Sequence, residues 1–137
     1  MKTIYTDGGC FPNPGRGGWA WAESKKVYDT GNKKHTTNNQ MELMAIIEAI
    51  KFQKERNPNV QLLIFSDSKY CVNGFTYWMH TWKRNNWKKP GGIKNLNLWQ
   101  QLYNLQENVN LRWVRGHNGN EMNEFVDSLC SIEVGIS

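Results

Sequence analysis

The sequence of 137 residues predicts an α/β fold in which a mixed β-sheet carries helices on both faces. Two observations lead to this prediction. Short strand-like segments open the chain, and a helical pattern then leads into a continuous apolar strand, after which helices and strands alternate. The length is that of one core, because single domains mostly contain about 100 to 150 residues. We therefore expect residues 1–137 to form one domain.

The first third of the chain predicts three antiparallel strands. Residues 2–6 (KTIYT) are typical of a short strand, and residues 7–18 are so dense in turn-forming residues that they predict a wide loop. Residues 18–22 (GWAWA) alternate large and small side chains, and strand character resumes at 26–29 after a turn. We expect an antiparallel meander over residues 2 to about 33.

The middle of the chain predicts a crossover helix and a buried parallel strand. Apolar residues over 39–56 recur at helical spacing, at Leu43, Ile46, Ile47 and Ile50. The sequence Asn57-Pro58-Asn59 ends this helix. Residues 62–65 (LLIF) are continuously apolar, as in a strand buried on both faces, and Asp67 or Ser68 could cap the helix that follows.

The remaining elements complete the sheet and its helical layers. Helices are expected over residues 69–82 and 96–105, a last strand over 109–115, a loop over 116–120, and a short terminal helix. The resulting order predicts five strands, of which the first three are antiparallel and the last two parallel.

Composition excludes several classes of protein. The amino terminus becomes polar before a signal-peptide core could develop, and no apolar run approaches the roughly 20 residues of a membrane span. The three cysteines are widely spaced, which argues against a disulfide framework and a zinc site. We therefore expect a cytoplasmic protein that has no membrane contact.

Four acidic residues lie where one edge of the sheet could collect them. Asp7 and Asp67 each end a predicted strand, and Glu42 and Asp127 lie on helices. Taken singly, each has an ordinary alternative role in a turn, a helix cap or a solvated helix; Glu42, for example, could complete a capping box with Asn39. Taken together, their charges would raise one another's pKa and destabilise the fold unless a cation neutralised them.

An all-oxygen ligand set without a cysteine or histidine pair favours Mg²⁺ or Mn²⁺ over zinc. Two such ions about 3.5 to 4 Å apart form the usual clamp for phosphodiester hydrolysis, so the acids predict a nuclease-type site. His117 lies in the loop sequence GHNGN, ten positions before Asp127. A lone histidine is more often structural or exposed, yet its unperturbed pKa of about 6.5 suits proton transfer beside a metal site.

The net charge of +5 is unevenly distributed. Residues 68–106 contain six of the 17 Lys and Arg residues and no Asp or Glu, so this segment carries +6 and the rest carries −1. The segment also contains four of the seven Trp residues. Trp78 and Trp82 share a helix face, and core packing is one explanation. The alternative is nucleic-acid binding, which is favoured because cations that can bind phosphates lie next to aromatic rings that can stack on bases.

Several motifs follow one another along nearly the whole chain: YTDGGC with NPGRGG, TTNNQMELMA, FSDSKY, WMHTWKRNNWKK with KNLNLW, and WVRGHNGNEMNEFVD. In order and spacing they resemble type 1 ribonuclease H. The resemblance implies a ribonuclease H-like fold and an endoribonuclease that hydrolyses the RNA strand of RNA/DNA hybrids. It further implies two Mg²⁺ per active site, with Mn²⁺ as a substitute, and 5′-phosphate and 3′-hydroxyl products.

The resemblance also implies roles for individual residues. Asp7, Glu42, Asp67 and Asp127 would be catalytic metal ligands, His117 would assist proton transfer and product release, and Glu124 would be a supporting acid. The nucleic-acid contacts would comprise Cys10, Asn13, Asn38 and Gln40 in the minor groove, Thr37 and Asn95 at a DNA phosphate, Trp78 and Trp82 in a channel for the DNA strand, and Lys83, Arg84, Lys88 and Lys89 in a basic protrusion.

Two positions depart from the family pattern. Gly9 stands where Ser or Ala is frequent, and Lys69 replaces a more usual neutral residue, which puts local substrate contacts in doubt. Two other functions stay open: a polynucleotidyl transferase of the same fold, and a catalytically silent nucleic-acid-binding module. The intact motif set argues against the first and the four acids against the second. We expect a monomer that binds RNA/DNA hybrid and needs no obligatory protein partner.

Overall fold

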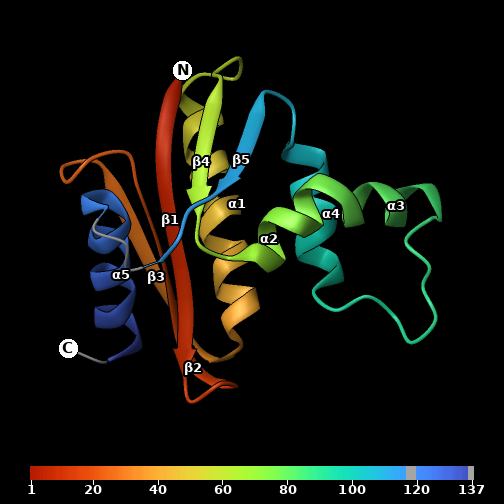
Figure 1. The fold of residues 1–137 in the computed structure, drawn as a ribbon, viewed down its shortest axis with the longest axis horizontal. Helices are drawn as coiled ribbons and strands as arrows, with labels where there is room; N and C mark the ends of the chain where they lie inside the picture. The colour runs from red at the N-terminus through yellow and green to blue at the C-terminus, as the bar shows by residue number, and fades with distance from the viewer. Residues whose placement is uncertain (117–119, 136–137) are drawn as a thin grey trace.

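The computed structural model describes residues 1–116 and 120–135. Its strands form one sheet in the order β3-β2-β1-β4-β5, in which β1 pairs antiparallel with β2 and parallel with β4 (Figure 1). The strands are β1 (Lys2–Phe11), β2 (Gly15–Ala22), β3 (Tyr28–Thr36), β4 (Leu62–Ser66) and β5 (Val109–Trp113). The helices are α1 (Asn38–Arg56), α2 (Lys69–Asn73), α3 (Met79–Arg84), α4 (Leu96–Leu105) and α5 (Glu121–Val134), with a π-helical turn η1 (Gly74–Trp78) between α2 and α3. This confirms the predicted mixed five-stranded sheet.

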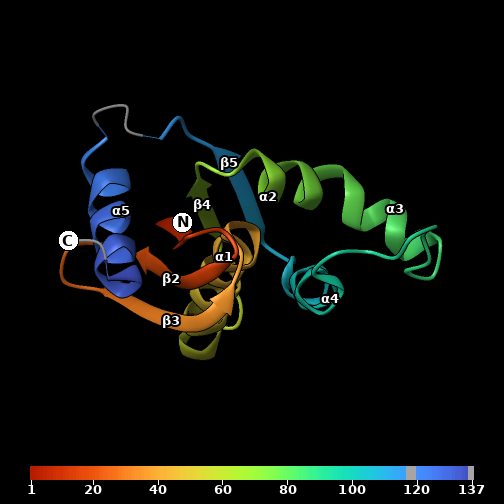
Figure 2. The ribbon, with the colours of Figure 1, turned by 90° about the horizontal axis from the view of Figure 1, so that it is seen from below.

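The alternation along β2 separates the two faces of the sheet. Trp19 and Trp21 belong to the larger core cluster, which includes the buried face of α1. Ala20 and Ala22 point to the opposite face and pack with Val126 and Cys130 of α5. Figure 2 shows α1 and α5 on opposite sides of the strands. Helices therefore cover both faces, as the order of the predicted elements indicated.

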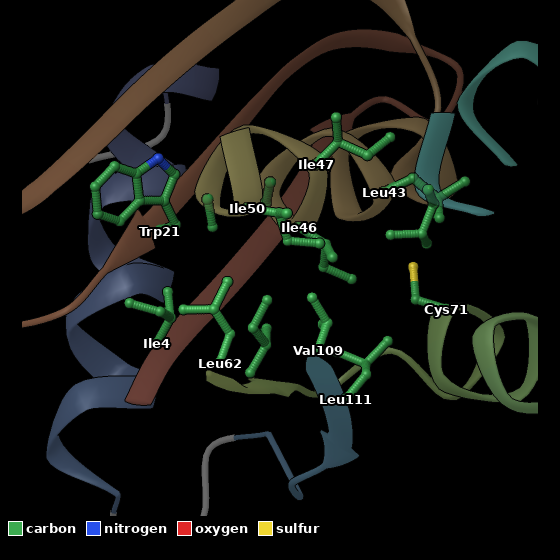
Figure 3. Close-up of a cluster of buried hydrophobic side chains, with 14 of the residues drawn as sticks. Ile4, Trp21, Leu43, Ile46, Ile47, Ile50, Leu62, Cys71, Val109 and Leu111 are labelled. Atoms are coloured by element: carbon green, nitrogen blue, oxygen red, sulfur yellow. The ribbon is translucent and has the colours of Figure 1, made fainter. Parts of the chain in front are cut away.

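The larger core lies between α1 and the sheet (Figure 3). The four apolar residues predicted to form one helix face, Leu43, Ile46, Ile47 and Ile50, are all buried. They face Ile4 of β1 and Leu62 of β4, whose side chains are fully buried. Burying each such side chain stabilises the fold by about 1.5–3 kcal/mol, so this layer fixes α1 firmly against β1 and β4.

The first hairpin differs from its prediction. The wide loop expected over residues 7–18 is wrong, because β1 continues to Phe11 and β2 begins at Gly15. Asp7 consequently lies inside β1, opposite Ala20, and does not end the strand. The glycines that indicated a loop instead pair across the hairpin, where Gly9 lies opposite Gly18. Glycine in a strand often marks a close approach of another backbone, which the sequence pattern does not distinguish from a turn.

The helices also differ in detail from their predictions. Thr37, and not Asn39, is the N-cap of α1, and its hydroxyl accepts a hydrogen bond from the Gln40 N–H. Ser68 caps α2 by accepting from the Cys71 N–H, at 3.1 Å. The helix predicted over 69–82 extends to Arg84 and contains the π-helical turn η1. Gly74 is the first residue of that turn, and a larger residue would not fit there because a Cβ would overlap the ring of Trp99.

No helix in residues 1–116 and 120–135 is both long enough and apolar enough to cross a bilayer.

Gly8 lies at a close approach between β1 and α1. A Cβ at Gly8 would overlap main-chain atoms of Met41 and Glu42. We expect Gly8→Ala to lower the free energy of unfolding by about 1–3 kcal/mol, because neither backbone can move without disturbing the core. Urea denaturation followed by circular dichroism would measure this change.

Gly9→Ala is the matched control. Its Cβ would lie 3.5 Å from Asn38 Oδ1, which is an ordinary contact, so we expect a change within about 0.5 kcal/mol. Equal destabilisation by both substitutions would contradict the close approach at Gly8.

Candidate active site

Three of the four predicted acids lie together at the edge of the sheet. Asp7, Glu42 and Asp67 each offer a carboxylate oxygen, and these oxygens lie within 4.8 Å of one another. The strand register places Asp7 and Asp67 side by side, because Thr6 of β1 pairs with Ser66 of the parallel strand β4 and each acid is the next residue in the sequence. The third arrives from α1, which Gly8 allows to approach β1 closely.

This acidic cluster is largely withdrawn from water. Asp7 is 7% exposed and Glu42 is 9% exposed. Asp7 Oδ1 accepts a hydrogen bond of 2.9 Å from the Gly8 N–H. Glu42 Oε1 is buried and has no hydrogen-bond partner among the residues that the structure describes. A buried oxygen without a partner costs free energy, so the cluster favours a ligand that can supply positive charge or a donor.

Burial and mutual repulsion disfavour ionisation here. Burial, together with the nearby charges of Asp67 and Asp127, raises the pKa of Asp7 to about 8. Burial also raises the pKa of Glu42 well above its usual range, with added repulsion from Asp7 and Asp67. The cluster therefore resists carrying all of its negative charges unless a cation is present.

The donor set fits a hard divalent cation. Only carboxylate oxygens face one another in the cluster, and such ligands suit Mg²⁺ or Mn²⁺ better than zinc. The unpartnered Glu42 Oε1 is the observation in favour of this fit. The three acids can therefore hold a metal ion without rearranging the elements that carry them.

The other predicted catalytic residues occupy α5 or lie outside the described residues. Asp127 is hydrogen-bonded to the Asp7 carboxyl and lines a shallow hollow of about 170 Å³ that also contains Asp7, Cys10 and Asn38. It is not one of the three mutually close acids. Glu124 is exposed one helical turn before it. His117 lies outside residues 1–116 and 120–135.

A side chain of β5 holds the main chain in place just after the end of β4. Trp113 of β5 donates its indole N–H to the Asp67 carbonyl oxygen at 3.1 Å. The Lys69 Nζ lies 4.8 Å from the centroid of the Trp113 ring. Lys69, which departs from the family pattern, therefore has an interaction partner in this structure. Its ammonium group lies over the ring of Trp113, the residue that fixes the main chain of Asp67.

Polar residues from three segments meet beside the acids. Asn38, at the start of α1, accepts a hydrogen bond of 2.7 Å from the Cys10 N–H. Asn13 Oδ1 accepts from the Asn38 N–H at 3.2 Å and from the Cys10 thiol at 3.2 Å. Three of the four residues expected at a minor groove are thus linked directly. The fourth, Gln40, instead accepts a hydrogen bond from the Thr36 hydroxyl.

Two adjoining hollows extend from these residues. The first, which we call the amide hollow, measures about 560 Å³ and is lined by Asn13, Pro14, Thr37, Asn38, Asn39, Tyr70, Lys94 and Asn95. The second, the aromatic hollow, also measures about 560 Å³ and is lined by Tyr70, Trp78, Thr81, Trp82, Lys89, Pro90, Gly91, Gly92 and Lys94. They share Tyr70 and Lys94, and Asn38 links the amide hollow to the hollow at Asp7. The surface therefore continues from the acids to the tryptophans.

The two tryptophans differ in how far they are buried. Trp78 is 37% exposed, whereas Trp82 is partly buried and packs against the core. Their ring centroids are 6.2 Å apart. Lys89 lines the same hollow, while Lys83, Arg84 and Lys88 are exposed and do not belong to its described lining. The connection between α3 and α4, which carries Lys88 and Lys89, extends away from the sheet (Figure 1).

Tyr70 and Lys94 were not among the residues selected individually from sequence. Both line the two hollows. The one signal for Tyr70 in the sequence was its position only three residues after Asp67, at the start of the helix that Ser68 caps. Lys94 was one of six basic residues in its segment, and composition alone could not distinguish it from exposed lysines.

Comparisons with known proteins identify the family. The family model described as RNase H matches residues 1–134. The chain belongs to the ribonuclease H family. A ribonuclease H of Dichelobacter nodosus is 46% identical, with 93% of this chain and 88% of that protein covered. A ribonuclease H of Hahella chejuensis is 41% identical, with 98% and 95% covered. This membership confirms the predicted resemblance and makes the chain a nuclease, a hydrolase of nucleic acid.

Solved structures agree with the fold. LC9-RNase H1, described as a type 1 RNase H with the type 2 active-site motif, has a TM-score of 0.84 and is 30% identical, with 97% of this chain and 71% of that chain covered. LC11-RNase H1, solved in complex with an RNA/DNA hybrid, has a TM-score of 0.73 at 19% identity, with 97% and 96% covered. At that identity the second likeness concerns the fold alone.

The raised pKa of Asp7 predicts how stability depends on pH. In the unfolded chain the carboxyl ionises near 3.8, whereas in the fold it keeps its proton up to about 8. Folding between these values requires proton uptake, so the free energy of unfolding of the metal-free protein should fall as pH rises from about 4 to about 8. Asp7→Asn should remove much of this dependence and be more stable than the parent at pH 8 in a chelator. Chemical denaturation across the pH range would measure both.

Asp29→Asn provides the control, because Asp29 is exposed on β3 and its substitution should leave the pH dependence unchanged. A chelated Asp7→Asn protein that is less stable than the parent at pH 8 would contradict the repulsion argument.

Proposed function

We propose that this protein is an endoribonuclease that hydrolyses the RNA strand of RNA/DNA hybrids. We further propose that Asp7, Glu42, Asp67 and Asp127 bind two Mg²⁺ ions, for which Mn²⁺ can substitute, and that the products carry 5′-phosphate and 3′-hydroxyl ends. The observation that carries the proposal is a buried acidic cluster, with an unpartnered Glu42 oxygen, that adjoins an amide-lined and then an aromatic hollow.

The acids supply the site for the metal ions. When bound, divalent cations supply the positive charge that activates a water molecule and stabilises the leaving oxygen of a phosphodiester. Asp7 and Glu42 are held rigidly by β1 and by the buried face of α1. Asp67 is held through its main chain by Trp113. Such fixed ligands position a phosphodiester without reorganising during the reaction.

Proton transfer completes the proposed mechanism. Asp127 borders the hollow at Asp7 and is carried by α5, whose first residue, Glu121, comes four positions after His117 in the sequence. We propose on the strength of the family resemblance that His117 moves a proton during hydrolysis and assists product release. Glu124 would add negative charge near this end of α5, one helical turn from Asp127.

The amide hollow supports recognition of the RNA strand. Asn38 Oδ1 is occupied by the Cys10 N–H, which fixes the orientation of the amide. Its Nδ2 group donates no hydrogen bond within the described part of the chain and is therefore able to donate to a ligand. A 2′-hydroxyl accepts such a bond, and this group distinguishes RNA from DNA. We propose that Cys10, Asn13 and Asn38 contact the minor groove, together with Gln40 beside them.

The aromatic hollow supports binding of the other strand. Trp78 and Trp82 offer ring faces for sugars and bases, and Lys89 and Lys94 offer charge for phosphates. Thr37 and Asn95 line the amide hollow next to it and would contact a DNA phosphate. Lys83, Arg84 and Lys88 would add longer-range attraction, because exposed cations raise the affinity for a polyanion without direct contact.

The wider setting is proposed from sequence. We propose that residues 1–137 act as one catalytic domain, as a monomer without an obligatory protein partner, and in the cytoplasm. The three free cysteines are consistent with a reducing compartment. The net charge of +5 suits a nucleic-acid substrate.

Cleavage of labelled duplexes tests the function directly. With Mg²⁺ present, we expect cutting of the RNA strand in RNA/DNA hybrid and none in DNA/DNA duplex. Asp67→Asn should abolish cutting while hybrid binding in chelator survives, because it removes a metal ligand but no part of either hollow. Gel analysis of strand-labelled substrates would measure cutting, and fluorescence anisotropy would measure binding.

The exposed Asp29→Asn substitution serves as the control and should cut normally. Robust cutting by Asp67→Asn would overturn the catalytic assignment. Strand transfer of DNA ends by the parent protein, without RNA cutting, would instead favour a transferase.

Lys89 gives a separate test of the binding surface. Lys89→Gln should weaken hybrid binding and reduce the slope of log affinity against log salt by about 0.9, as expected when one phosphate contact is lost. Lys26→Gln removes the same charge from the exposed turn between β2 and β3, which lies at the opposite end of the molecule from the connection between α3 and α4 that carries Lys89 (Figure 1). Identical salt slopes for the two variants would show that Lys89 acts only through net charge.

A further inference from the structure

Tyr70 stands between the two hollows. It lies in the first turn of α2, three residues after Asp67, and it lines both the amide hollow and the aromatic hollow. Its ring packs against Trp78 and Trp99, with centroid separations of 5.6 Å to each. The helix that begins beside the acidic cluster therefore also carries the residue at which the two hollows meet.

The Tyr70 hydroxyl accepts two hydrogen bonds. Asn95 Nδ2 donates to it at 3.1 Å, and Trp99 Nε1 donates to it at 3.1 Å. Trp99 is fully buried, so the Tyr70 oxygen satisfies an indole N–H that water cannot reach. Trp99 in turn lies against Gly74 of the π-helical turn. One oxygen thus joins α2 to the start of α4.

Asn95 depends on this oxygen for its orientation. It precedes α4 with φ of 61°, in the left-handed region, and its side chain makes no capping hydrogen bond to the helix. The amide group is instead held by Tyr70. An amide nitrogen carries two hydrogens, so one is used by Tyr70 and the other remains to donate to a ligand in the amide hollow.

We propose that Tyr70 is a positioning residue for substrate binding. Its hydroxyl holds the Asn95 amide at the boundary of the two hollows, and that amide donates a hydrogen bond to a phosphate of the uncut strand. This inference rests on the proposed function. Tyr70 acts through Asn95 and has no part in the chemistry at the acids. Its loss therefore weakens hybrid binding and leaves the chemical step unchanged.

Tyr70→Phe removes the oxygen and retains the ring. We expect KM for hybrid cleavage to rise about fivefold, which corresponds to one hydrogen bond of ordinary strength, while kcat stays within about twofold. Affinity measured by anisotropy in chelator should fall by the same factor. The salt slope should stay unchanged, because no charge is removed. Thermal unfolding would establish that the variant is folded at the assay temperature.

Tyr103→Phe is the matched control. Tyr103, on α4, also packs against an aromatic ring, that of Trp87, and it is absent from the described lining of both hollows. Its substitution should leave KM unchanged. An equal rise in KM for both variants would overturn the proposal, because it would reflect general loosening of the aromatic cluster.

A double-mutant cycle separates positioning from stability. If Tyr70 acts through Asn95, Tyr70→Phe combined with Asn95→Ala should bind hybrid no more weakly than Asn95→Ala alone. Additive losses would overturn the proposal. Binding in chelator requires no cutting, so a parent protein that binds hybrid but cuts nothing would refute the proposed function and leave the Tyr70 result interpretable.

Discussion

Electrostatic repulsion among buried acids is the constraint on which this fold depends. Asp7, Glu42 and Asp67 lie within a few ångströms of one another, and two of them are nearly excluded from water. Such an arrangement costs free energy in a metal-free protein, and the cost must be offset by the surrounding core. The layer between α1 and the sheet does so, because it fixes Glu42 and Asp7 on elements that cannot separate without exposing buried isoleucines.

The strain is localised where neighbouring segments approach most closely. Gly8 lets α1 lie against β1, and the parallel pairing of β1 with β4 sets Asp7 beside Asp67. Trp113 reaches across from β5 to hold the main chain at Asp67. Each acid is thus fixed by a different interaction: strand pairing, helix packing and a side-chain hydrogen bond. Pre-organised ligands of this kind bind a cation without an ordering cost.

Much of the architecture could be predicted from the sequence, because hydrophobic period distinguishes helix from strand. The face formed by Leu43, Ile46, Ile47 and Ile50 is buried as expected, and the alternation of large and small residues over 18–22 belongs to a strand, β2, as predicted. The hairpin over residues 7–18 could not be predicted, because glycines that allow close packing have the same pattern as glycines that allow turns. The edge strand β3 extends further than predicted. Its residues are mostly exposed and polar, so the sequence shows no alternation of apolar and polar residues that would have indicated where the strand ends.

The acids could be selected from sequence, but the links between the binding residues could not. Asn38, Cys10 and Asn13 form one network through side-chain and main-chain bonds that cross 28 and 25 positions of the chain. Tyr70 joins segments 25 and 29 positions apart. Sequence spacing carries no signal for such contacts, because they depend on how α2, α4 and the first hairpin meet in space.

The junction of the two hollows has a consequence for selectivity between duplexes and single strands. Because Tyr70 and Lys94 belong to both linings, the two hollows keep a fixed separation. A ligand held in one hollow would present its second strand to the other at high effective concentration, so the second contact would be intramolecular. On the proposed function, a lone strand would occupy one hollow and gain nothing from the other. A rigid boundary between two modest sites can therefore provide avidity that neither site has separately.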